Sequence, residues 1–142
     1  MRELMVRWFR GDAAAIEFAE QLWDVMQRWD DVLDEGAVDK ANDVFQWLGF
    51  GMNYLPFFAR YETLLRPAML LAYLGWRDAN ELELSGDPAD DEKAFMLRAG
   101  IYDVYALMAW IIGGEGHSRT VGPEIRRAYA ERLATFKGTP DA

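Results

Sequence analysis

Apolar residues recur along this chain at the three-to-four-residue spacing of an α-helix, and no stretch shows the alternation of a strand. The clearest case begins after Asp12, a residue suited to cap a helix, runs to about Asp34 and ends before Gly36. One face of this stretch carries Ile16, Ala19, Leu22, Trp23, Met26, Trp29 and Leu33. Such a pattern predicts an all-α fold.

The same spacing continues in stretches 38–53, 57–84 and 90–112, and in a last stretch that Pro123 opens and that ends near Phe136. In the second helix the expected buried face consists of Ala41, Val44, Phe45, Leu48 and Met52. Pro67 is expected to kink the third stretch, and the glycine-rich run 113–118 is expected to form a loop. We therefore predict one domain over residues 1–142, a compact bundle of five or six helices with a buried central helix near residues 90–112.

Composition excludes several classes of function. The chain has no cysteine, which removes disulfides, thiolate metal sites and cysteine nucleophiles. Its net charge of −9 argues against nucleic-acid binding through phosphate neutralisation. Because the N-terminus has charges scattered through it and no continuous apolar core, we expect no signal peptide and a cytoplasmic location. The apolar run 94–112 contains Arg98 and Asp103, so it is interpreted as a core helix and not as a membrane span.

Several polar residues fall on faces that are otherwise apolar. In the first long helix Asp30 lies on the apolar arc and Asp34 follows one turn later, so both are expected to be partly buried. Asn80 and Glu83 continue the apolar stripe of the third stretch, and Arg98 and Asp103 are the only charges of the central helix between residues 94 and 112. The six residues predicted to share one interior are Asp30, Asp34, Asn80, Glu83, Arg98 and Asp103.

Two interpretations of this cluster remain open. Arg98 could neutralise the acids in a buried ion-pair network, since a buried carboxylate must find a partner. Alternatively, a set of four carboxylates could bind Mg²⁺ or Mn²⁺, with Arg98 and Asn80 binding a phosphorylated small molecule. The metal ligands would then be Asp30, Asp34, Glu83 and Asp103.

The sequence Asp30-Asp31-Val32-Leu33-Asp34 resembles the aspartate-rich DDxxD element of isoprenyl diphosphate synthases and class I terpene cyclases. In those all-α enzymes the aspartates hold Mg²⁺ against a diphosphate, so the resemblance implies that chemistry for the acidic cluster. Their second metal motif is not recognisable in Asn80-Glu81-Leu82-Glu83, and the chain is about half as long as those folds require.

A second resemblance is carried by Trp29-Asp30-Asp31 together with Ala79-Asn80-x-x-Glu83. These short sequences are similar to ones in small, uncharacterised, all-helical proteins of tailed phages. The resemblance implies a viral origin and brings no known activity with it.

Two functions from different classes follow from these observations. The first is a small acidic intracellular protein that binds another protein or forms a homo-oligomer, with no membrane or nucleic acid as partner. The second is a Mg²⁺- or Mn²⁺-dependent enzyme or sensor of a phosphorylated small molecule. We favour the first, because surplus negative charge alone does not define an active site.

Overall fold

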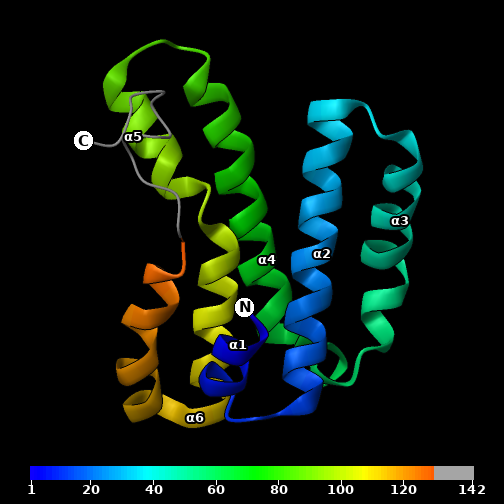
Figure 1. Cartoon of the computed structure of the whole chain (residues 1–142), viewed down its shortest axis with the longest axis vertical. Helices are drawn as coiled ribbons and strands as arrows, with labels where there is room; N and C mark the ends of the chain where they lie inside the picture. The colour runs from blue at the N-terminus through cyan, green and yellow to red at the C-terminus, as the bar shows by residue number, and fades with distance from the viewer. Residues whose placement is uncertain (130–142) are drawn as a thin grey trace. The chain divides into compact units, whose positions relative to one another are not determined.

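In the computed structural model, residues 1–129 are described, and within this range the chain forms helices and no strand. The elements are α1 (Arg2–Trp8), α2 (Ala13–Glu35), α3 (Val38–Gly49), the 3₁₀ helix η1 (Gly51–Tyr54), α4 (Pro56–Glu83), α5 (Pro88–Leu97) and α6 (Gly100–Arg127). Figure 1 shows their order along the chain. The all-α fold predicted from the sequence is confirmed.

The chain divides into two compact units, one formed by Met1–Thr63 and the other beginning at Leu64. The boundary lies inside α4, close to two interruptions of regular helix. Tyr61 has a non-helical backbone, and Pro67 cannot donate a backbone hydrogen bond to the preceding turn. The single domain over residues 1–142 stays a prediction.

In the first unit, the ends of α2 are set by local chemistry. The Asp12 carboxylate accepts a hydrogen bond from the backbone N–H of Ala15 at 3.0 Å, which satisfies a free donor of the first turn. At the other end Gly36 adopts a left-handed conformation with φ of 68°, which a residue with a Cβ rarely adopts. Helix α2 therefore ends within one residue of its predicted end.

Aromatic side chains form the core of the first unit, where α2 packs along α3. The ring of Phe18 on α2 stacks on Trp47 of α3 and on Phe57 and Phe58 at the start of α4, with centroids 5.8 to 6.2 Å apart. The indole Nε1 of Trp47 donates to Oε1 of Gln21 at 2.7 Å. This buried stacking joins three helices, and the hydrogen bond satisfies the polar atom of a largely buried tryptophan.

Part of the predicted buried face of α3 is wrong. Val44 is buried, as is Met52 in the following η1, but Phe45 is 70% exposed and Leu48 is half-exposed. The helix has apolar residues on two faces and only one of them packs against α2. The prediction of a helix from the apolar spacing is therefore correct, but the prediction that Phe45 and Leu48 are buried is wrong.

In the second unit, the stretch predicted as one helix over 90–112 is two helices, α5 and the first part of α6, separated at Arg98 and Ala99. Gly100, directly after the break, packs closely on α4: a Cβ at this position would lie 3.0 Å from the backbone of Ala72. The residues that α6 buries include Val104, Tyr105, Met108 and Ala109. The predicted central helix is thus buried mainly in its second half.

Helix α6 reverses direction at Gly114, whose backbone angles of 76° and −168° are accessible to glycine only. Figure 1 shows the two arms of α6 joined by this bend. Tyr102 on the first arm donates to the carbonyl oxygen of Ala128, just beyond the second arm, at 3.3 Å. The predicted loop at 113–118 is accordingly one sharp bend, since the chain is helical again after Gly114. Pro123 lies inside the second arm, and the predicted helix end at Phe136 falls outside the described residues.

Among residues 1–129, the segment Pro88–Arg127 is long and apolar enough to cross a membrane, by length and composition alone. Of its tested 18-residue window, 33% is buried in the structure. The segment bends at Arg98–Ala99 and again at Gly114. Where in the cell the protein resides stays a prediction.

Candidate functional site

Three of the six predicted site residues, Asn80, Glu83 and Arg98, meet in the second unit. Arg98 donates from Nε and from one terminal nitrogen to the two carboxylate oxygens of Glu83, at 2.6 and 2.8 Å. The same terminal nitrogen donates to Oδ1 of Asn80 at 2.6 Å. The predicted contact between Arg98 and Glu83 is therefore present.

Local structure explains this meeting. Glu83 is the last residue of α4 and Asn80 lies one turn before it, so both face the same side. Arg98 is the C-cap residue of α5, where the chain turns toward α6. The side chains of Arg98 and Glu83 are 23% and 33% exposed. Arg98 and Glu83 form a bidentate ion pair, which stabilises the junction of α4, α5 and α6.

Asp103 does not lie where the sequence placed it. Its side chain is 65% exposed and pairs with Arg126 of the second arm of α6, so its predicted burial is wrong. The break before Gly100 resets the rotation of the helix, and Asp103 therefore does not point the way that a continuous helix from residue 90 would require. The carboxylate lies in the first turn of α6, where the helix dipole favours a negative charge.

Asp30 and Asp34 lie in α2 of the first unit. Asp30 is half-buried, as predicted, whereas Asp34 is exposed, so its predicted burial is wrong. Asp34 is the second-to-last residue of α2, where fewer neighbouring side chains cover the helix. The two aspartates belong to one unit and the Asn80–Glu83–Arg98 group to the other. Within residues 1–129, no group of three or more histidine, aspartate or glutamate side chains is arranged to hold a metal ion.

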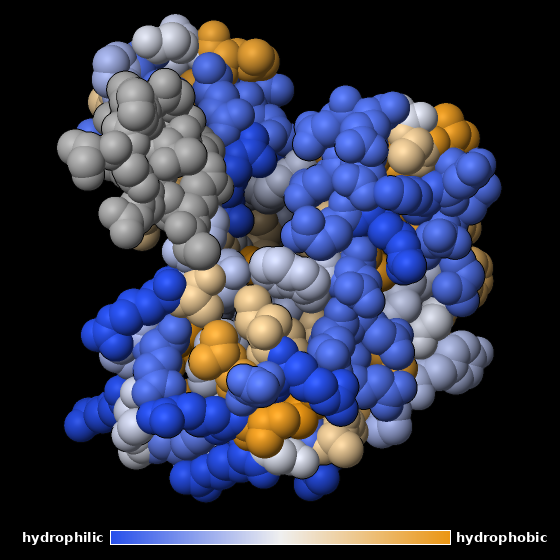
Figure 2. Space-filling model, in the orientation of Figure 1, coloured by the Kyte–Doolittle hydropathy of each residue, from blue (hydrophilic) through white to orange (hydrophobic). Residues whose placement is uncertain are grey.

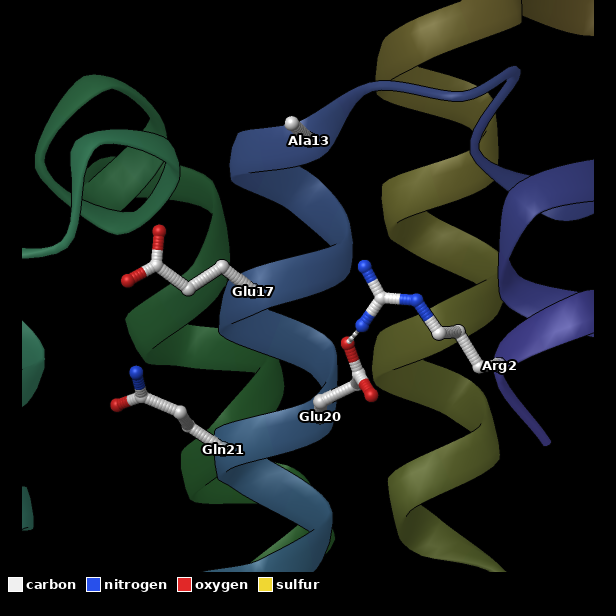
Figure 3. A pocket seen from close by; sticks show the side chains of 5 residues that line it. All are labelled: Arg2, Ala13, Glu17, Glu20 and Gln21. Carbon is white, nitrogen blue, oxygen red and sulfur yellow. Dashed lines mark hydrogen bonds and ion pairs between the residues drawn. The ribbon is translucent and has the colours of Figure 1, made fainter.

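A shallow, polar hollow of about 330 Å³ lies in the first unit. Its lining residues are Arg2, Ala13, Glu17, Glu20 and Gln21. Arg2 and Glu20 form an ion pair on one side of α2, while Glu17 and Gln21 point to the other side (Figure 3). Since Gln21 already accepts the hydrogen bond of Trp47, the hollow has no set of polar groups converging on one point.

The feature that the sequence reasoning missed is an exposed aromatic group at the end of α3. Phe45 and Phe50 are 70% and 57% exposed and contact each other edge to face, with ring centroids 6.0 Å apart. Tyr54, four residues further along the chain, is 85% exposed. Phenylalanine and tyrosine side chains cover about 150–250 Å² each when buried, so these three expose on the order of 400 Å² in total. We call Phe45, Phe50 and Tyr54 the aromatic corner.

A signal for this corner was present in the sequence. Val38, Ala41, Phe45 and Leu48 are spaced by three, four and three residues, which places them along one side of a helix. Val44 and Trp47 lie on a different side and are buried. Helix α3 therefore has more apolar surface than its packing against α2 covers.

The fold and these side-chain groups define an acidic, all-α protein that has a structural ion-pair group in one unit and an exposed apolar helix face in the other. Comparisons with protein-family models, curated proteins and solved structures found no match to this chain.

Proposed function

We propose that this chain acts by binding another protein or by assembling with itself. The observation that carries the proposal is the aromatic corner on α3. Single exposed apolar residues are common on protein surfaces, but exposed apolar side chains in contact with one another, as the rings of Phe45 and Phe50 are, are typical of interaction sites. Aromatic residues are also enriched among those that contribute most to binding.

The surroundings of the aromatic corner support this proposal. Hydrophilic side chains cover most of α2 in the view of Figure 2. Other large apolar side chains of the first unit are exposed as well, among them Leu4, Val6 and Leu33, but each of these is less than half exposed. A patch that is apolar within a polar surface is the usual form of a binding surface. The resemblance to small helical phage proteins is compatible with such a role and adds no activity.

The polar groups support structure more directly than catalysis. Arg98 uses its donors on Glu83 and Asn80, and Asp103 pairs with Arg126. Glu83 and Asp103 each have a protein cation as partner, and such a pair competes with binding of a metal ion. The alternative function, a Mg²⁺- or Mn²⁺-dependent enzyme or sensor, would require these pairs to open.

The experiment that tests the proposal compares the parent chain with Phe45→Ser. Both are used as immobilised bait in quantitative capture from cells that produce the protein, and both are examined by sedimentation velocity. We expect a captured protein or a self-association that the parent shows and Phe45→Ser loses. Leu71→Ser, at another position that is 70% exposed, is the matched control and should behave as the parent does.

The opposite result is equally definite. If parent and Phe45→Ser behave identically, the interaction proposal is wrong. If Mg²⁺ or Mn²⁺ with a nucleotide also raises the melting temperature of the parent, the alternative function takes its place. Any ligand that prefers the native state raises the melting midpoint, so this measurement detects the alternative function directly. Asp103→Asn should then abolish the metal-induced rise.

A further inference from the structure

The exposed face of α3 extends beyond the aromatic corner. Val38, at the first turn of the helix, is 73% exposed, and Ala41, Phe45 and Leu48 continue from it toward Phe50. From Val38 to Leu48, an interval of ten residue steps, an α-helix rises about 15 Å, or nearly three turns. We call Val38, Ala41, Phe45 and Leu48 the α3 stripe.

The spacing of the α3 stripe is that of a helix-pairing seam. Positions separated alternately by three and four residues stay on one side of a helix and meet the same positions of a partner helix that lies alongside. The residues of α3 that pack inside the unit, Val44 and Trp47, are on another side and take no part in the stripe. A helix is therefore the element whose shape matches this surface.

The negative charge around the α3 stripe indicates which kind of partner helix could bind there. Between residues 28 and 60 the chain has six acidic residues and three basic residues, Arg28, Lys40 and Arg60. Lys40 is already bound to Asp31, with Nζ and Oδ2 2.6 Å apart. Asp43 lies 4.0 Å from Arg28, and the other exposed carboxylates within five residues of Val38 are those of Asp34, Glu35 and Asp39.

This charge disfavours a second copy of the chain. Two copies that met through their α3 stripes would bring two negatively charged segments together, and like charges across an interface oppose association. A partner with lysine or arginine beside its apolar seam would instead be attracted, and faster at low salt.

We infer that the α3 stripe, with the aromatic corner at its end, binds one amphipathic helix of a different protein, and that basic residues flank the apolar seam of that helix. This inference rests on the proposed function and specifies its partner. The apolar seam of the partner would cover Val38, Phe45 and Leu48, and its basic residues would face the exposed carboxylates near Val38, such as that of Asp39.

Two designed peptides test this inference with the full chain. Each contains three heptads with the same leucine seam, one with lysine and the other with glutamate at the flanking positions. Calorimetry should show at least about tenfold tighter binding of the lysine peptide, and this preference should shrink when salt is raised, because salt screens exposed charges. Phe45→Ser should weaken binding of the lysine peptide about tenfold or more, and Leu71→Ser should not.

Folding of each variant is checked by its circular dichroism and melting temperature, which a substitution at a mostly exposed position should leave nearly unchanged. Equal affinity for the two peptides, no binding of the lysine peptide, or unchanged binding by Phe45→Ser would each overturn the inference. So would a dimer of the parent that Phe45→Ser dissociates, since the second copy would then be the occupant. Such a dimer would overturn the inference but would leave the proposed function standing. If parent and Phe45→Ser also gave the same result in the capture and sedimentation experiments, the proposed function would be wrong as well.

Discussion

Arg98 donates hydrogen bonds to both carboxylate oxygens of Glu83, fifteen residues before it in the sequence. This pair connects the last turn of α4 to the break between α5 and α6. Neither side chain is fully buried, which limits both the desolvation cost of the pair and the energy that it contributes. The pair is nevertheless two-pronged and shared with Asn80. It is therefore the polar contact in the second unit whose removal should be easiest to measure.

We expect Arg98→Met to lower the free energy of unfolding by roughly 1–2 kcal/mol, because Glu83 and Asn80 lose a charged donor while the apolar part of the side chain is retained. Urea denaturation measures the change. Arg77→Met is the matched control, since Arg77 pairs with Asp78 at an exposed position and should contribute less than about 0.5 kcal/mol. Equal effects of the two substitutions would contradict a special role for the Arg98 group.

Two phenylalanines of the first unit should respond very differently to truncation. Phe18 is fully buried and stacks on three aromatic rings, so Phe18→Ala should cost about 3–5 kcal/mol of unfolding free energy. Phe45→Ala removes a ring that is 70% exposed and should cost less than about 1 kcal/mol. Thermal or urea denaturation of both variants checks this contrast. A large loss for Phe45→Ala would mean that the α3 stripe is part of the core.

Gly114 and Gly116 provide a test of the bend in α6. At neither position would a Cβ meet another atom within 4 Å, so space does not distinguish them. Gly114 has a positive φ of 76°, whereas Gly116 is helical. Gly114→Ala should therefore destabilise the protein by about 1–3 kcal/mol, and Gly116→Ala should stabilise it by about 0.5–1 kcal/mol. If both variants gain stability, α6 does not reverse at Gly114.

Stability should fall in alkaline solution, in part because of Tyr102. Burial raises the pKa of its phenol above the ordinary value, so the folded chain keeps this proton at a pH where the unfolded chain releases it. The resulting stability is fully present below about pH 10, the pKa of the unfolded group, and is lost as the pH rises through the folded pKa.

Tyr102→Phe should therefore show a smaller fall in unfolding free energy between about pH 9 and 11 than the parent shows. The slope is compared, because the substitution also removes the hydrogen bond to Ala128 at every pH. Some fall should remain, since the hydrogen bond to Asp31 raises the pKa of Lys40, and that contribution is likewise lost in alkali. Identical slopes in parent and variant would show that Tyr102 titrates normally in the folded chain.

Much of the fold was readable from the sequence because it depends on local chemistry. Asp12 and Gly36 mark the ends of α2, since a side-chain acceptor and a left-handed backbone act within one turn of the residue that supplies them. The grouping of Asn80, Glu83 and Arg98 was also anticipated, because each polar residue interrupts an apolar face. The grouping of the polar residues needed only the helical period, and the helix ends needed only the local chemistry of Asp12 and Gly36.

Tertiary structure decided the rest. Asp103 became exposed because the break at Ala99 changed the rotation of the helix that carries it, and the sequence pattern runs through that break without a visible interruption. Phe45 is exposed because α3 has apolar residues on two faces, and its packing against α2 covers only one of them. The helical period predicts which residues share a face of a helix. Whether that face is buried depends on how many other elements pack against the helix, and no short stretch of sequence determines that number.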